Sequence, residues 1–111
     1  MNIFQKIAIS HYINRNKDKV EYAYRYDIGN STGMHSVKIK NKGSVSIEMH
    51  RDYWGNTYFG ITYNLKGSDE YSLPPCQLSF FDRPFVSRMY QKMFDSFVAK
   101  NGMPNNNSRQ R

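Results

Sequence analysis

Three residues with acid–base chemistry alternate near the middle of the chain: Glu48, His50 and Asp52. Residues two apart on a β-strand share a face, so these three groups would lie within reach of one another. Such a set could serve a metal ion or a general base. A catalytic site needs more partners than this sequence supplies. We therefore interpret the three as a solvated strand face with a Glu48–His50 pair, and we expect the protein not to be an enzyme.

Two further patterns match catalytic motifs only in part. The triplet at 50–52 reads His-Arg-Asp, as in the catalytic loop of protein kinases, but the chain lacks the glycine-rich loop and its lysine and is too short for that fold. Ser10 precedes His11, but no acidic residue nearby could orient the imidazole, which argues against a hydrolase. Both patterns are better explained by chance.

The remaining reactive side chains favour structural roles. Cys76 is the one cysteine, so it cannot form an intramolecular disulfide, and without a neighbouring base we expect it to be a small buried hydrophobe. His35 falls on the core face of its strand and is expected to be buried and hydrogen-bonded. The sequence has no paired cysteines for zinc and no glycine-rich phosphate loop. We expect no catalytic residue, metal or cofactor.

Positive charge is the strongest chemical signal. The 111 residues contain 16 Lys and Arg against 9 Asp and Glu, a net charge of +7. Residues 1–66 contain ten basic and five acidic residues, residues 67–100 contain four of each, and the last segment adds two arginines. The excess therefore belongs to the first two thirds of the chain and to the tail.

The densest cluster is Lys38, Lys40 and Lys42, in a stretch without acidic residues between Asp27 and Glu48. Alternation puts Lys38 and Lys40 on the solvent face of a strand and Lys42 in the following turn, with Arg25 on the corresponding face of the preceding strand. Clustered cations of this kind can bind a phosphate backbone. The alternative is that exposed lysines only keep strand edges soluble and unpaired.

Aromatic residues interleave with the basic ones. Tyr22, Tyr24 and Tyr26 share a face with Val20 and Ile28, which favours a role in the core over a stacking platform. Tyr58 is turned outward by the alternation, and Tyr53 and Trp54 precede a Gly-Asn turn. Trp54 could stack on a base or anchor a protein partner, or it could fold back over the end of the core. The predicted binding residues are thus Arg15, Lys17, Lys19, Arg25, Lys38, Lys40, Lys42, Tyr53, Trp54 and Tyr58.

The periodicity predicts an α+β fold that positions these residues. Ile3, Phe4, Ile7, Ala8 and Tyr12 recur at helical spacing, with Asn2 and Gln5 as a capping box, and predict a helix over about 3–15 whose apolar stripe faces the core. Ile9 and Ile13 lie off that stripe. Alternation then predicts a four-stranded antiparallel meander over about 20–65, with a tight turn at 41–43.

A second helix is expected over about 83–100. Asp82 is its predicted N-cap, Pro84 lies in its first turn and Gly102 follows its end. Its apolar stripe is broad: Phe85, Val86, Met89, Tyr90, Met93, Phe94, Phe97 and Val98. Residues 76–81 could add a short edge strand. We expect one domain over 1–103 and a flexible basic tail over 104–111.

The order of a helix, antiparallel strands and a second helix resembles that of double-stranded-RNA-binding domains. That family carries a lysine-rich signature at the start of its last helix, where this chain has residues 82–88, Asp-Arg-Pro-Phe-Val-Ser-Arg. The resemblance is one of topology, and no residue role follows from it.

Two functions of different classes remain. The first is a small binding protein that contacts DNA, RNA or a nucleoprotein complex through the lysine-rich hairpin. The second is an accessory protein, in the style of phages and mobile elements, that docks on an acidic host protein or complex and inhibits or modulates it. Pairing of two copies through a sheet edge is compatible with either.

The start of the chain has no signal-peptide pattern. No apolar run approaches the length of roughly 20 residues that a membrane helix needs. We therefore expect a cytoplasmic location and no membrane partner.

Overall fold

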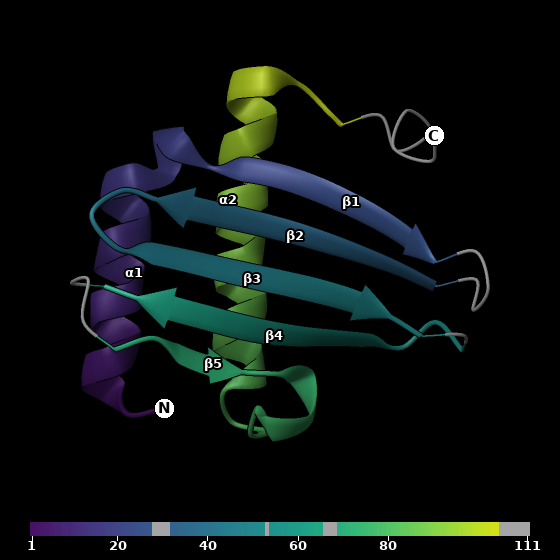
Figure 1. The fold of residues 1–111 in the computed structure, drawn as a ribbon, viewed down its shortest axis with the longest axis horizontal. Helices are drawn as coiled ribbons and strands as arrows, with labels where there is room; N and C mark the ends of the chain where they lie inside the picture. Colours follow the sequence, from purple (N-terminus) through teal and green to yellow (C-terminus); the bar gives the residue numbers. More distant parts are fainter. Residues whose placement is uncertain (28–31, 53, 66–68, 105–111) are drawn as a thin grey trace.

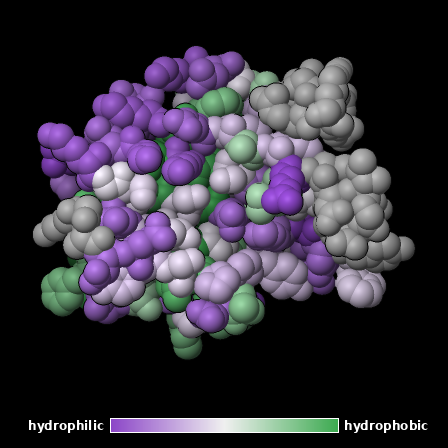
Figure 2. Space-filling model, viewed as in Figure 1, coloured by the Kyte–Doolittle hydropathy of each residue, from purple (hydrophilic) through white to green (hydrophobic). Residues whose placement is uncertain are grey.

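The computed structural model describes residues 1–27, 32–52, 54–65 and 69–104. It confirms the α+β class: two helices pack on one face of an antiparallel sheet (Figure 1). The helices are α1 (Ile3–Asn16) and α2 (Arg83–Asn101), and short 3-10 turns follow α1 (η1, Lys17–Lys19) and precede α2 (η2, Pro75–Gln77). The other face of the sheet is open, and Figure 2 shows that face as mainly hydrophilic.

The sheet is a meander in which each strand pairs with the next one along the chain. Its strands are β1 (Glu21–Asp27), β2 (Thr32–Lys40), β3 (Ser44–Arg51), β4 (Thr57–Asn64) and β5 (Tyr71–Leu73). The four predicted strands are present, and a fifth lies at the edge beside β4. The edge strand expected over residues 76–81 is wrong: the chain forms the 3-10 turn η2 there and then leads into α2. There the chain turns instead, and the Gln77 N–H donates to the Pro74 carbonyl at 2.9 Å.

The β2–β3 turn needs its glycine. Lys42 and Gly43 both have positive φ, 51° and 120°. A Cβ on Gly43 would lie 2.5 Å from the carbonyl oxygen of Asn64, closer than any side chain could approach. The predicted tight turn at 41–43 is therefore confirmed, and it holds Lys42 at an exposed tip.

The core lies between the sheet and the two helices. Alternate residues of the central strands point inward and pack on the predicted stripe of α2. Fully or nearly fully buried are Ile9, Ile13, Val20, Val37, Ile39, Val45, Ile47, Ile61, Tyr63, Leu78, Phe85, Val86, Met89, Tyr90 and Met93. Tyr22 also packs inward, with its ring centroid 5.6 Å from those of Phe94 and Phe97, as the core interpretation predicts.

The predicted core face of α1 is wrong. The helix buries Ile9 and Ile13, while Ile3, Phe4 and Ile7 are 61%, 77% and 59% exposed. The helix carries two apolar stripes, and the narrower one covers the sheet. The capping box is confirmed: the Gln5 N–H donates to Asn2 Oδ1, and the Asn2 N–H donates to Gln5 Oε1, both at 2.8 Å.

Asp82 stands at the start of α2 but does not cap it through its side chain. Its buried carboxylate instead accepts from the Met1 amino group at 3.1 Å and from Lys6 Nζ at 3.0 Å. Burial alone would raise the pKa of Asp82, but these two cationic donors and Ser79 lower it below its ordinary value. The pair of contacts fixes the start of α1 beside the start of α2.

Candidate functional site

The C-terminal half of α1 is fastened to the β2–β3 turn by side-chain hydrogen bonds. The Tyr12 hydroxyl donates to the Asn41 carbonyl at 3.0 Å and accepts from the Asn41 N–H at 3.1 Å. Asn41 Nδ2 donates to Asn16 Oδ1 at 2.8 Å, and Asn16 Nδ2 donates to the Tyr12 carbonyl at 2.9 Å. The bonds to Asn41 join segments that are distant in the sequence, and they give the turn a fixed position against the helix.

This attachment collects most of the predicted basic residues at one end of the molecule. We name this region the basic end and define it by Arg15, Lys17, Lys19, Lys38, Lys40 and Lys42, all exposed. They come from α1, η1 and the β2–β3 hairpin. Arg15 and Lys42 line one groove of about 420 Å³, together with His11 and Tyr12. In Figure 2, strongly hydrophilic surface covers the corner where η1 and the end of α1 lie.

Strand register places η1 beside the lysine hairpin. Glu21 pairs with Lys38 across β1 and β2, so the segment just before β1 lies level with the end of β2. The 3-10 turn η1 contacts β2, which brings Lys19 to the same end as Lys40. Two acidic residues lie among these cations: Asp18 is in η1 between Lys17 and Lys19, and Glu21 pairs with Lys38. The six cations of the basic end outnumber these two acidic residues.

Arg25 shares the open face with Lys38 but lies elsewhere along it. Arg25 pairs with Met34, whereas Lys38 pairs with Glu21. At the usual rise of a strand, the positions of the two pairs are roughly 13 Å apart. The structure therefore does not bring Arg25 into the lysine cluster.

The aromatic candidates lie at the opposite end from the basic end. Trp54 and Tyr58 flank the β3–β4 turn, and β3 runs between this turn and the lysine hairpin. At the usual rise of a strand, that separation is roughly 25 Å. Trp54 is 81% exposed, so it does not fold back over the end of the core, which was one of the two orientations left open by the sequence. Tyr58 is 38% exposed, as predicted. Tyr53 lies outside the described residues.

Asp52 holds the turn that carries Trp54. Its Oδ1 accepts from the N–H groups of Trp54 and Asn56, both at 2.9 Å, and its Oδ2 accepts from the Tyr58 hydroxyl at 3.2 Å. Desolvation raises the pKa of Asp52, but the hydrogen bonds from Asn56, Tyr58 and Trp54 outweigh it and lower that pKa. Asp52 is thus a structural residue of the turn.

The alternating acid–base set does not form one site. His50 Nε2 lies 3.5 Å from Glu48 Oε1, which is the predicted pair on the open face. That nitrogen makes no hydrogen bond within the part of the chain that the structure describes. In the same described ranges, no three His, Cys, Asp or Glu side chains are grouped closely enough to hold a metal ion.

His35 lies half-buried on the helix-covered face of the sheet. Its Nδ1 is 2.5 Å from the Tyr22 hydroxyl, and its ring centroid is 4.7 Å from that of Tyr24. Burial, and secondarily the charge of Arg51, lower the pKa of His35. The neutral imidazole can accept the Tyr22 proton, so the predicted structural role fits. Cys76, by contrast, is exposed in η2, and its predicted burial is wrong because the turn carries it outside the core.

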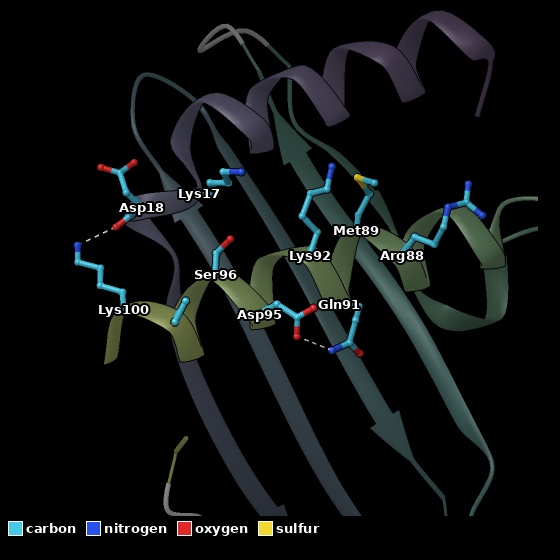
Figure 3. A pocket seen from close by; sticks show the side chains of 10 residues that line it. Lys17, Asp18, Arg88, Met89, Gln91, Lys92, Asp95, Ser96 and Lys100 are labelled. Atoms are coloured by element: carbon cyan, nitrogen blue, oxygen red, sulfur yellow. Dashed lines mark hydrogen bonds between the residues drawn. The ribbon is translucent and has the colours of Figure 1, made fainter. Parts of the chain in front are cut away.

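The sequence interpretation missed the cations of α2, which lie beside the predicted Lys17 of η1. Lys92, Lys100 and Lys17 line a groove of about 960 Å³ on the outer side of the helices (Figure 3). Lys92 Nζ donates to Asn14 Oδ1 at 2.9 Å, and Lys100 Nζ donates to the Asp18 carbonyl at 2.8 Å. Asp18 and Asp95 line the same groove, so its four cations, which also include Arg88, stand beside two carboxylates. The sequence interpretation overlooked the cations of α2 because residues 67–100 contain four basic and four acidic residues.

Comparison of the chain with models of known protein families, with curated proteins and with solved structures finds no match. Neither of the two helices in the described ranges has an apolar stretch that would cross a bilayer.

Proposed function

We propose that this protein is a non-enzymatic nucleic-acid-binding protein that contacts the phosphate backbone through its basic end. The observation that supports it is the gathering of six exposed cations from three segments of the chain beside two acidic residues. Each cation that neutralises a phosphate releases condensed counterions, and this release drives association. We place this activity in the cytoplasm.

The fixed geometry of the basic end adds to the case. The Tyr12 and Asn16 hydrogen bonds hold the hairpin tip against α1, so Lys42 and Arg15 flank one groove without further ordering of the backbone. A binding surface ordered before contact loses less conformational entropy on binding.

Recognition at the basic end is expected to be independent of sequence, because phosphate contacts position a protein without reading bases. The exposed aromatic candidates lie at the far end of β3, roughly 25 Å away at the usual rise of a strand. The proposed contact is with the basic end alone, and Trp54 is not part of it.

Fluorescence anisotropy with labelled duplex DNA, single-stranded DNA and RNA of about one helical turn tests the proposal. The variant Arg15→Ala, Lys40→Ala, Lys42→Ala should bind at least tenfold more weakly than the unchanged protein. A control with equal charge loss, Arg25→Ala, Arg51→Ala, Arg83→Ala, removes exposed cations outside the basic end and should retain the affinity. Equal loss in both variants, or no binding of any of the three probes, would count against the proposal.

A further inference from the structure

The side of the helix pair that faces away from the sheet carries an apolar groove. Ile3 and Ile7 of α1 and Phe81, just before α2, line a groove of about 620 Å³ between the two helices. These three side chains are 61%, 59% and 83% exposed. Large apolar side chains grouped in this way on a surface mark an interaction site more often than scattered ones do.

Along its length the groove changes from mainly apolar, with Lys6 as the one charged side chain that the described residues place in that part of its lining, to more polar and basic. Beyond Ile7 its lining becomes His11, Asn14 and Arg88. Arg88 also lines the adjoining groove with Lys17, Lys92 and Lys100, and these four cations outnumber the two carboxylates there, Asp18 and Asp95 (Figure 3). We name the two adjoining grooves the helix seam. On one side the seam is lined by residues 3, 7, 11 and 14 of α1, so it runs the length of that helix. On the other side it is lined by residue 81, just before α2, and by residues 85, 88 and 92 of α2.

We propose that the helix seam binds an acidic amphipathic helix of a partner protein. Two neighbouring helices present a furrow into which the side-chain ridge of a third helix can pack. Apolar residues of the partner would fill the space between Ile3, Ile7 and Phe81. Its carboxylates would lie beside Arg88, Lys92 and Lys17. This inference goes beyond nucleic-acid binding, because it concerns a different face and a different class of partner.

Charge argues against a second copy of the chain as the occupant. The charged side chains of α1 are Lys6 and Arg15, and the helix contains no Asp or Glu. If α1 of one copy lay along the seam of another, cations would meet cations. Like charges that oppose each other across an interface weaken association strongly. An acidic helix satisfies both the apolar and the basic part of the seam.

The test is selection from a displayed library of helical peptides with fixed leucines at i, i+4 and i+7 and random flanking residues. Selection on the unchanged protein should enrich peptides rich in Asp and Glu. The enrichment should be at least tenfold greater than in selection on the double variant Ile7→Ser, Phe81→Ser. Because Ile7 and Phe81 are exposed, this variant should keep its stability, which circular dichroism checks. Selection on Arg88→Glu, Lys92→Glu should instead enrich basic flanks, and Trp54→Ala, an exposed apolar residue outside the seam, should select as the parent does.

Three results would overturn the proposal. One is enrichment that does not depend on Ile7 and Phe81, or no enrichment at all. Another is a dimer in light scattering that Ile7→Ser, Phe81→Ser dissociates, which would assign the seam to a second copy. The third is binding to lipid vesicles that the same variant abolishes, without peptide enrichment, which would assign it to a membrane surface.

Discussion

Tyr12 and Asn41 exchange two hydrogen bonds across 29 positions of the sequence: the tyrosine hydroxyl accepts from the asparagine N–H at 3.1 Å and donates to its carbonyl at 3.0 Å. The Asn41 N–H also donates to the Gly43 carbonyl at 3.0 Å, so one side chain adds to the hydrogen bonding of a turn whose next two residues have positive φ. The same contact brings Lys42 beside Arg15. The hydroxyl of one tyrosine therefore joins the C-terminal half of α1 to the turn that carries Lys42.

Tyr12→Phe should lower the free energy of unfolding by about 1–2 kcal/mol, since it removes two partly buried hydrogen bonds and little volume. Urea denaturation measures the loss. Tyr58→Phe is the matched control, because its hydroxyl bonds to Asp52 in an exposed turn. Removal of that hydroxyl should cost no more than about 0.5 kcal/mol. Equal stability of Tyr12→Phe and the unchanged protein would show that the Tyr12–Asn41 bonds contribute nothing.

Replacing isoleucines on the two stripes of α1 should separate core from surface. Ile9 is fully buried, whereas Ile7 is 59% exposed. Ile9→Ala should therefore lower the free energy of unfolding by about 2–5 kcal/mol. Ile7→Ala should change it by no more than about 0.5 kcal/mol. Thermal and urea unfolding of both variants check this, and the reverse order of effects would mean that α1 packs through its other stripe.

Stability should depend on pH through His35. Its pKa is lowered in the folded protein, so below its ordinary value of 6.5 the unfolded chain binds the proton first. The contribution of His35 to the free energy of unfolding should therefore be fully present above pH 6.5. It should decrease as the pH falls from there towards the pKa of His35 in the folded protein. Urea midpoints at several pH values measure the slope.

His35→Asn should remove that slope, while His11→Asn, a change at an exposed site on α1, should keep it. If His35→Asn keeps the slope of the unchanged protein, the pH dependence belongs to other groups.

The sequence predicts those features of the fold that are set locally. Period-two alternation identifies β1 to β4, and the stripe of α2 and its glycine end follow from residues that are neighbours along the helix. The sequence does not predict the strand β5, because its three residues are too few to show the alternation of a strand. The sequence does not predict which face of α1 packs on the sheet, because the helix has two apolar stripes. Only the position of the sheet decides that Ile9 and Ile13 are buried rather than Ile3 and Ile7.

The candidate site was predictable by face but not by position along the strands. Alternation assigns Lys38 and Arg25 to the open face, yet strand register separates them, and it places Trp54 at the far end of β3. The approach of Arg15 to Lys42 depends on the Tyr12–Asn41 bonds, which have no local sequence signal. The position of the α2 cations, such as Lys92, beside Lys17 arises from helix packing alone.

The most direct test of the central claim, that the basic end binds nucleic acid through phosphate contacts, is the salt dependence of affinity. For duplex DNA, the logarithm of the association constant plotted against the logarithm of salt concentration should have a slope of about −3 to −5, since each phosphate contact contributes about −0.9. Arg15→Ala, Lys40→Ala, Lys42→Ala should make the slope shallower by about 2 to 3, whereas Arg25→Ala, Arg51→Ala, Arg83→Ala should leave it unchanged. A slope near zero in the unchanged protein, or the same change in both variants, would contradict the claim.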